Sequence, residues 1–230
     1  MNFTFELASI PIEVEFKTVK TLRLTVYPPD GRVSITAPTG THRDAIGKFA
    51  ASRIAWIEKH RERFLSHSRL SPSLQNKSTV YVWGKPYGLK LAEREGNSKI
   101  VIDGDCVKMY IRPGAAKTKR TEVLDRWYRR ALKEAASPII KKWESKIGVT
   151  VQKLYIRKMK SCWGSCNCQK QTLRLNSELA KRNPECLDYV VLHEMLHIIE
   201  KGHNRNFYGL MNQFMPEWKI IRKKMNSGEI

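Results

Sequence analysis

The sequence predicts an α+β protein: a β-rich N-terminal domain with one long helix, followed by a largely helical C-terminal domain with a small sheet. Apolar and polar residues alternate in the first forty positions, which is the period of strands. Apolar residues recur at spacings of three and four over 118–147, which is the period of a helix. With 230 residues, 41% of them hydrophobic, the chain can bury a sizeable core.

The N-terminal domain is predicted to begin with a hairpin. Residues 21–26 and 32–37 alternate in polarity, and the Pro-Pro-Asp-Gly sequence at 28–31 between them is a turn signal. Residues 38–41 end the second strand. This pattern predicts a small antiparallel pair near the start of the chain.

A helix is predicted to follow over about 42–66, with Thr41 placed to cap it. His60 and His67 lie near its C-terminal end, where a positive charge suits the helix dipole. We interpret both as surface residues rather than ligands. The polar segment 68–76 is then expected to be a loop.

Four more strand-like segments complete the N-terminal domain. They lie near residues 79–83, 87–92, 99–102 and 107–111. Glycine-containing turns at 84–86 and 103–105 separate some of them. Because Arg112-Pro113-Gly114 then breaks the pattern, we predict one domain over 1–114 and a second over 115–230.

The C-terminal domain is predicted to start with the long helix at about 118–147. Pro138 should kink or break this helix, because proline has no amide hydrogen to donate. Gly148 is in the usual position for ending a helix. Two short strands are expected near 153–157 and 172–176.

Two further helices are predicted at the end of the chain. Asn183, Pro184 and Glu185 supply a cap, a first-turn proline and an acid near the positive end, so a helix is expected over 184–201. A last helix is predicted over 204–225. No internal sequence repeat stands out.

Charge and composition restrict the function classes. The net charge is +20, and residues 112–160 hold 15 Lys or Arg against 4 Asp or Glu. Such a region attracts polyanions, so nucleic acid is a candidate partner, although a solvated basic face is equally compatible. No apolar run long enough to span a membrane exists. Five cysteines and no signal-peptide pattern favour the cytoplasm. The oligomeric state stays open.

The most informative motif is His193-Glu194-Met195-Leu196-His197, followed by His203. His193 and His197 are one helical turn apart, so both imidazoles project from one face and can bind one metal ion. Glu194 lies about 100° further round the helix, where it can reach a metal-bound water. His203 can supply a third nitrogen from beyond the helix end.

Three protein ligands and an open fourth position are typical of a catalytic zinc site. Leu192, Leu196 and Ile199 belong to an apolar arc opposite the two histidines, so the helix should be buried on most sides. Gly202 is expected to let the backbone turn and bring His203 back. We therefore predict one Zn²⁺ ion held by the three histidines, with Glu194 as the catalytic residue.

A cysteine-rich segment precedes this helix. Cys162, Cys166 and Cys168 fall within seven residues, but their spacing is not the paired Cys-x-x-Cys of common zinc sites. A second metal site and a nucleophilic cysteine are weaker alternatives. The preferred interpretation is a tight turn beside the zinc site, with Trp163 as a wall and Gly164 as a point of close backbone approach.

With these motifs in place, the chain resembles the YgjP-like family of zinc-dependent hydrolases, which is grouped with minimal gluzincin-type metallopeptidase folds. The resemblance covers nearly the whole chain. It is carried by Trp163-Gly164-Ser165-Cys166, Leu175-Asn176, the histidine motif with His203 and Phe207, Pro29-Asp30-Gly31, Trp56-Ile57 and Gly84-Lys85-Pro86-Tyr87. Cys162 departs from the arginine that the family usually carries there. The chain is also similar to SprT-like and WLM zinc domains, so a zincin-like C-terminal domain is implied.

Supporting residues are less well defined by the sequence. Candidates for contact with substrate are Trp163, Ser165, Asn176, Arg205 and Tyr208. Tyr208, Tyr189 and Arg205 are also candidates for stabilising an oxyanion. Glu200 and Glu217 are candidate acceptors for the second ring nitrogens of the histidines.

Three functions are compatible with the sequence. The first is a zinc peptidase, in which a peptide pairs with the strand containing Leu173–Asn176. The second is a zinc-dependent hydrolase of a phosphoanhydride such as a nucleoside triphosphate, drawn in by the basic region 112–160. The third is a basic nucleic-acid-binding module with a zinc-stabilised fold, for which Glu194 would have no use.

Overall fold

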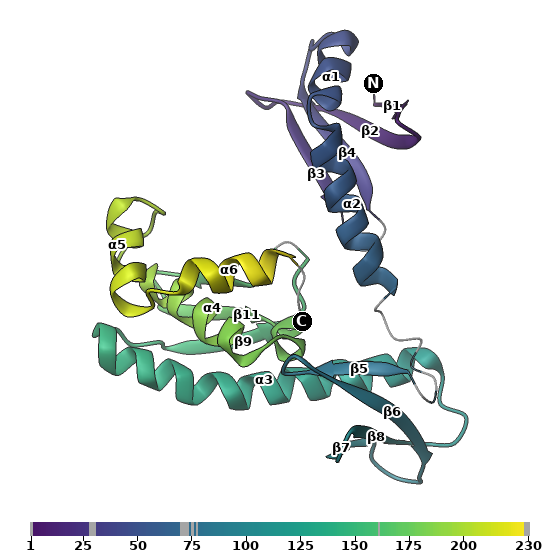
Figure 1. Cartoon of the computed structure of the whole chain (residues 1–230), viewed down its shortest axis with the longest axis vertical. Coiled ribbons are helices and arrows are strands. Elements are labelled where there is room, and N and C mark those ends of the chain that lie inside the picture. Colours follow the sequence, from purple (N-terminus) through teal and green to yellow (C-terminus); the bar gives the residue numbers. More distant parts are fainter. Residues whose placement is uncertain are drawn as a thin grey trace. The chain divides into compact units, whose positions relative to one another are not determined.

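A computed structural model describes residues 2–27, 31–69, 74, 76, 78–160 and 162–227 (Figure 1). For residues 63–69, 226 and 227 only the backbone is described. The chain forms two compact units, residues 1–71 and 72–230. Helices and small mixed sheets occur in it together, so the predicted α+β class is confirmed.

The first unit contains a four-stranded sheet with strand order β1-β2-β4-β3. Its strands are β1 (Phe3–Leu7), β2 (Ile10–Lys17), β3 (Arg23–Tyr27) and β4 (Arg32–Pro38). The antiparallel pairing of β3 with β4 confirms the predicted hairpin. Most of the predicted turn, at 28–30, lies outside the described residues.

The predicted helix at 42–66 is two helices, α1 (Arg43–Ala51) and α2 (Ile54–Arg69). Thr41 does not cap α1, because its hydroxyl donates to the carbonyl of Pro38 at 2.8 Å and His42 occupies the cap position. Buried Ile46, Ala50 and Ile57 pack with strand residues into the core of this unit. The prediction was wrong about the cap and about continuity.

The second unit begins with another four-stranded sheet. Its strands are β5 (Thr79–Val82), β6 (Lys85–Glu93), β7 (Lys99–Asp103) and β8 (Cys106–Ile111), in the order β5-β6-β8-β7. All four predicted strands are present. In both sheets an antiparallel hairpin comes first, its second strand pairs in parallel with the fourth, and the third and fourth are antiparallel.

The strand plan is therefore used twice, although the sequence shows no repeat. The first hairpin of each sheet turns through two consecutive residues with positive φ, Ala8-Ser9 and Trp83-Gly84. Consecutive positive φ values give the twist that a two-residue hairpin requires. A sheet plan can be preserved without similar side chains, because backbone pairing defines it.

The second sheet shares one hydrophobic core with the helices that follow it. Leu89, Val107 and Met109 of the sheet belong to the same buried cluster as Leu132 of α3 (Lys117–Ile147). The Tyr128 hydroxyl of α3 also donates to the carbonyl of Tyr81 in β5 at 2.7 Å. The predicted boundary at residue 114 therefore falls inside the second compact unit, and the observed division is near residue 71.

The sequence predicted either a kink or a break at Pro138. Helix α3 runs through Pro138 without a break. Gly148 ends the helix as predicted, with φ of 69°. Pro138 is exposed on the surface of the helix. The helix then has a continuous buried side that reaches from the second sheet to the histidine-bearing helix.

A three-stranded sheet follows α3, with strand order β10-β11-β9. Strands β9 (Lys153–Arg157) and β11 (Thr172–Asn176) were predicted, and β10 (Gly164–Asn167) was missed. Its four residues, Gly-Ser-Cys-Asn, have no apolar alternation to reveal it. Strand β11 is central, parallel to β9 and antiparallel to β10.

The chain ends with a short 3₁₀ helix and three α-helices. The 3₁₀ helix covers Ser177–Lys181, and α4 (Pro184–Leu196), α5 (Arg205–Phe214) and α6 (Trp218–Ser227) follow. The predicted last helix at 204–225 is thus interrupted at Met215–Glu217, where Pro216 cannot continue the hydrogen bonding. No helix in the described part of the chain is both long and apolar enough to cross a membrane.

Candidate metal centre

Helix α4 is held at its N-terminus and along its buried side. The Asn183 side chain accepts a hydrogen bond from the Glu185 amide, and Pro184 occupies the first turn, as predicted. The hairpin of the second sheet abuts this end: a Cβ on Gly84 would lie 3.2 Å from the Cα of Asn183. On α3, the Trp143 indole donates to Asp188 at 2.6 Å. These contacts fix the helix that carries the histidine motif.

Helix α4 ends earlier than predicted, at Leu196, and His197 is its C-terminal cap residue. Gly202 was expected to let the backbone turn towards His203. The chain turns at 197–199 and bends again over 201–204, which includes Gly202. The φ of Gly202 is not positive, and a methyl group there would meet no atom within 4 Å, so neither backbone conformation nor space requires glycine at this position.

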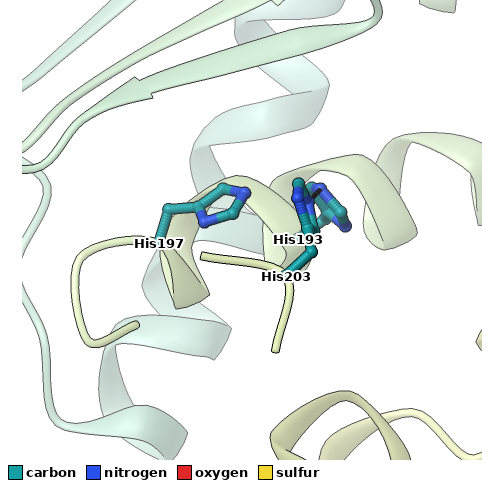
Figure 2. A group of neighbouring side chains, drawn as sticks. All are labelled: His193, His197 and His203. Carbon is teal, nitrogen blue, oxygen red and sulfur yellow. Dashed lines mark hydrogen bonds between the residues drawn. The ribbon is translucent and has the colours of Figure 1, made fainter. Parts of the chain in front are cut away.

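The three histidines come together as predicted (Figure 2). One nitrogen from each of His193, His197 and His203 lies within 4.8 Å of the others. The Nε2 atoms of His193 and His203 are 3.0 Å apart. Two nitrogen ligands on one tetrahedral zinc ion stand roughly 3.3 Å apart. The arrangement therefore fits one metal ion.

Phe207 forms the apolar floor beneath the three imidazoles. Its ring is stacked on His197 at 4.7 Å and meets His193 and His203 edge to face at 5.0 and 4.8 Å. Phe207 is fully buried, and Asn204 fixes its backbone by accepting from its amide at 3.0 Å. His203 and the floor beneath the imidazoles thus come from one short segment.

The protonation of the histidines suits metal binding. Burial, followed by the nearby His197 and His203, lowers the pKa of His193 to about 3. Burial, followed by the nearby His197, also lowers the pKa of His203. His193 is therefore neutral at physiological pH and can offer a nitrogen lone pair.

The second ring nitrogen of His197 has a partner. Its Nδ1 lies 3.0 Å from the backbone carbonyl of Glu200, which leaves Nε2 for a metal when Nδ1 carries the proton. Glu200 was predicted as an acceptor for a histidine ring nitrogen through its carboxylate, but it accepts through its backbone carbonyl. Glu217, the other predicted acceptor, is exposed.

Glu194 is buried against strand β10. Only 8% of the residue is exposed, and a Cβ on Gly164 would lie 2.6 Å from the Glu194 Cγ. Real Cβ atoms do not approach so closely, so position 164 requires glycine, as the predicted close approach implied. Burial raises the pKa of Glu194 to about 7, which is suited to a group that takes up and releases a proton.

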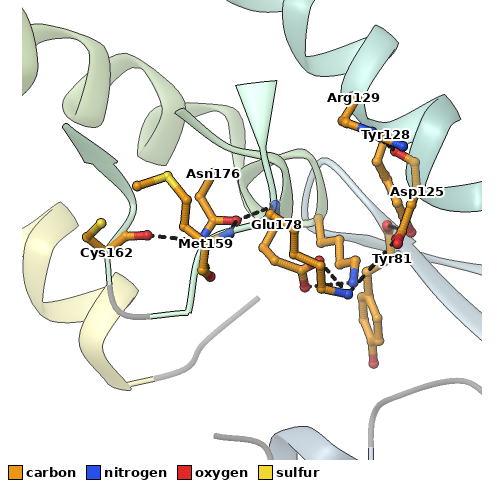
Figure 3. A network of polar contacts seen from close by, with 10 residues as sticks. Tyr81, Asp125, Tyr128, Arg129, Met159, Cys162, Asn176 and Glu178 are labelled. Atoms are coloured by element: carbon orange, nitrogen blue, oxygen red, sulfur yellow. Dashed lines mark hydrogen bonds and ion pairs between the residues drawn. The ribbon is translucent and has the colours of Figure 1, made fainter. Parts of the chain in front are cut away.

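Asn176, one of the predicted substrate contacts, instead holds the loop that leads into β10 (Figure 3). Its Nδ2 donates to the carbonyls of Met159 and Cys162, both at 2.9 Å. Its Oδ1 accepts from the amides of Met159 and Glu178, both at 3.2 Å. The buried side chain is thus fully occupied by the protein's own backbone.

Neighbouring Glu178 extends this polar network to α3. Burial alone would raise its pKa, but Lys181 at 2.7 Å and Lys158 at 3.6 Å hold the pKa below its ordinary value. Lys158 also approaches Asp125 of α3. The acidic groups of this region are therefore paired inside the fold.

The other predicted contacts are distributed around the centre. Trp163 is half-buried, with the guanidinium of Arg182 5.4 Å from its ring centroid. Tyr208 lies 6.3 Å from the His203 ring, centroid to centroid, and stacks on Trp218. Arg205 and Tyr208 both line a pocket of about 820 Å³ on α5.

Ser165 lines a second pocket, of about 510 Å³, on the β9–β11–β10 sheet. We call it the basic sheet pocket. Its lining residues are Tyr155, Arg157, Ser165, Cys166, Asn167, Lys170, Thr172 and Arg174. Three of them are cations and none is an acid.

Arg222 of α6 is a residue of the centre that the sequence reasoning missed. Burial and the neighbouring histidines lower the pKa of His193 and His203, and the charge of Arg222 adds to this effect. Burial raises the pKa of Tyr189, and the charge of Arg222 opposes that rise. The only sequence signal was the basic run Arg222-Lys223-Lys224, which did not distinguish Arg222 from its neighbours. Tyr189 itself stands 5.7 Å from the His193 ring.

The cysteines do not form a second centre in the described residues. The only group of His, Cys, Asp and Glu there that can share a metal ion is the three histidines. All five thiols are free, and Cys162 is exposed. Burial, followed by Cys168 and then Glu194, raises the pKa of Cys166 to about 12.

A mixed α+β chain with this centre is a metal-dependent hydrolase of the metallopeptidase class. The chain belongs to the YgjP-like family, because the model of the YgjP-like metallopeptidase domain matches residues 20–228. The match covers most of both compact units and includes the histidine motif.

Two solved structures are similar to parts of the chain. One is the metallopeptidase zymogen abylysin of Pyrococcus abyssi, with 18% identity and a TM-score of 0.37, covering 39% of this chain and 90% of that one. The other is the zymogen jannalysin of Methanocaldococcus jannaschii, with 25% identity and a TM-score of 0.36, covering 43% and 90%. No curated protein matches the chain.

Proposed function

We propose that the chain is a zinc metallopeptidase in which His193, His197 and His203 hold the metal and Glu194 is the general base. The observation that carries the proposal is the convergence of three imidazole nitrogens within 4.8 Å beside a buried glutamate. A zinc ion held by these three imidazoles would supply a water of lowered pKa and would polarise the scissile carbonyl. The free thiols agree with a cytoplasmic location.

Glu194 is suited to moving the proton of the attacking water. Its pKa of about 7 permits it to take a proton and then to return it to the leaving amine. Strand β10 holds this carboxylate against Gly164, which keeps it from rotating away. Tyr189, whose ring centroid lies 5.7 Å from that of His193, and Arg222, whose charge acts on His193, are the candidates for stabilising a developing oxyanion.

The peptide substrate is proposed to pair with β10. The sequence predicted that the peptide pairs with the strand containing Leu173–Asn176. That strand, β11, cannot accept a peptide, because it is hydrogen-bonded to a neighbouring strand on both sides. In the described part of the chain β10 is paired on one side only. Its free edge can accept an extended peptide beside Glu194.

Hydrolysis of a phosphoanhydride is the second candidate. The observation that favours it is the basic sheet pocket, which offers Arg157, Lys170 and Arg174 to an anionic substrate. A nucleic-acid module without catalysis is less well supported, because burying Glu194 is costly and no ion pair among the described residues offsets that cost.

A panel of casein, a peptide mixture and nucleoside triphosphates, assayed with the zinc-loaded protein, tests the proposal. Glu194→Gln should lower the rate at least about a hundredfold while zinc content stays at one ion per chain. Glu217→Gln, an exposed change of the same chemistry, is the matched control and should stay active. Peptide cleavage that survives Glu194→Gln contradicts the proposed role, and cleavage of triphosphates alone favours the second candidate.

A further inference from the structure

The basic sheet pocket lies on the face of the β9–β11–β10 sheet that carries its polar side chains. Pairing places Tyr155, Arg174 and Ser165 side by side across the three strands. Directly paired residues in a sheet share a face, so these side chains stand on the same surface. Leu173 and Leu175, which alternate with Arg174, point into the core on the other face.

The cations of this pocket have no partner in the described residues. Arg157 and Arg174 make no ion pair or side-chain hydrogen bond there, and neither does the ammonium group of Lys170. Lys158, adjacent to Arg157 in the chain, is paired with Asp125 and Glu178. The nearby acids are thus used elsewhere, and the pocket presents three uncompensated positive charges to a ligand.

The pocket and the carboxylate of Glu194 lie on opposite faces of β10. Gly164, which pairs with Leu175 on the core face, lies against Glu194, whereas Ser165 and Asn167 of the pocket, one and three residues further along the strand, stand on the other face. A peptide added to the edge of β10 alternates its side chains between these two faces. A strand rises about 3.3 Å per residue, so the pocket begins within about 10 Å of Glu194. Cys166 lines the pocket, and the Glu194 charge acts on its thiol.

We propose that the basic sheet pocket is the substrate subsite that selects an acidic side chain, Asp or Glu, of a peptide paired with β10. This inference rests on the proposed peptidase function. Alternate side chains of a peptide added to the free edge of β10 stand on the pocket face. Ser165 is small, so the long side chain of Arg174 on the next strand can reach over it to a carboxylate.

The lining favours a peptide over single-stranded nucleic acid. Sites for single strands stack successive bases on several aromatic side chains. Tyr155, 40% exposed, is the only aromatic residue among the described residues that line this pocket. Two of the lining residues, Ser165 and Asn167, belong to the edge strand itself, so the pocket and the peptide-pairing edge form one surface.

Matched internally quenched peptides test the preference. A peptide mixture first identifies a cleaved sequence, and the residues flanking the cut are then varied between Glu and Gln. Wild type should cleave the Glu peptide with a kcat/KM roughly tenfold higher. Arg174→Gln should abolish this preference, Arg174→Lys should keep part of it, and Lys141→Gln, an exposed lysine of α3, should leave it unchanged.

Two results would contradict the proposed acidic subsite and leave the peptidase function intact. One is cleavage of the Glu and Gln peptides at equal rates, and the other is a preference for Glu that Arg174→Gln does not change. If the zinc-loaded protein cleaves no peptide at all, the proposed function fails, and binding then decides the subsite. Glu194→Gln should bind a fluorescent Glu-rich peptide, and the further change Arg174→Gln should weaken binding roughly tenfold. Displacement of that peptide by a single-stranded oligonucleotide, but not by an unlabelled Glu-rich peptide, would assign the pocket to nucleic acid instead.

Discussion

Gly164 is the residue on which the position of Glu194 depends most directly. A methyl group there would lie 2.6 Å from the Glu194 Cγ and 2.8 Å from its Oε1. The Glu194 side chain or strand β10 would have to move to relieve this overlap. The position of the proposed general base thus depends on both the histidine motif and a strand outside it.

Gly164→Ala should therefore reduce peptidase activity about a hundredfold, because displacements near 1 Å at a reacting group have effects of that size. Unfolding should also become easier by about 1–3 kcal/mol from overpacking. Steady-state kinetics and thermal denaturation measure both. Gly202→Ala is the control, since nothing lies within 4 Å of its Cβ position. Equal effects of the two changes would show that the contact with Glu194 is not the cause.

The cysteines differ in the reactivity that the structure predicts. The pKa of Cys166 is raised to about 12, so its thiolate fraction at pH 8 is roughly a thousandfold below that of an ordinary cysteine. Cys162 is exposed. Iodoacetamide at pH 8 should label Cys162 first and leave Cys166 largely unmodified, as read by peptide mass spectrometry. Labelling of Cys166 should increase as the pH rises towards 12, and equally fast labelling of both at pH 8 would refute the prediction.

Among single residues, the sequence identified those defined by local spacing. His193, His197 and Glu194 follow from helical periodicity, and the third histidine lies close by in the chain. Arg222 could not be found in this way, because it reaches the centre only through the packing of α6. Asn176 was a candidate because it belongs to the strand expected to pair with a peptide and to the Leu175-Asn176 motif of the family resemblance. Its bonds to Met159 and Cys162 depend on a loop path that spacing does not reveal.

At the scale of elements, the loop before β10 depends on a single amide side chain. Asn176 both donates to and accepts from backbone groups of this loop. Strand β10 in turn positions Gly164 against Glu194. A change at the end of β11 should therefore alter the position of the Glu194 carboxylate, the proposed general base, through the loop before β10.

Asn176→Asp should destabilise the protein by about 2–4 kcal/mol, because a carboxylate oxygen would replace the Nδ2 donor and face two carbonyls. Urea denaturation measures the loss. Asn167→Asp is the matched control: the Asn167 Oδ1 accepts from the Lys170 amide at 2.9 Å, and a carboxylate can accept the same bond. Similar stability of the two variants would contradict a structural role for Asn176.

Elements with strong periodicity were predicted with nearly their observed bounds. Helix α3 and strands β9 and β11 are examples. The errors in helix bounds occurred where the apolar spacing continues past the end of a helix. Pro216 separates α5 from α6, and α4 ends at Leu196 although apolar residues continue to Ile199. Apolar spacing alone does not record where the backbone stops being helical.

At the scale of the molecule, the two compact units have separate hydrophobic cores. Residues of β1–β4 and α1 with Ile57 form one, and residues from Leu74 to Met225 form the other. The second core includes Leu89, Val107 and Met109 of the second sheet. The Arg-Pro-Gly sequence at 112–114 suggested a domain boundary. A turn of this kind ends a strand, but the same hydrophobic core continues on both sides of it.

A protein of residues 72–230 should therefore fold and bind one zinc ion, whereas residues 115–230, cut at the boundary that the sequence suggested, should not fold cooperatively. Removing β5–β8 exposes the side of α3 that packs against them and deletes part of the core. Circular dichroism during thermal denaturation and zinc titration compare the two. Cooperative folding of 115–230 with unchanged zinc affinity would contradict the single core.

The contact of Phe207 with all three imidazoles has a thermodynamic consequence. Phe207 is part of the main core, so any ion that fixes the histidines also holds the core in its folded packing. A ligand that binds only the folded state adds about 4 kcal/mol when its free concentration is a thousand times its dissociation constant. The melting temperature of the protein should therefore rise with the concentration of free zinc. Removing zinc with a chelator should destabilise the core as well as the proposed metal site.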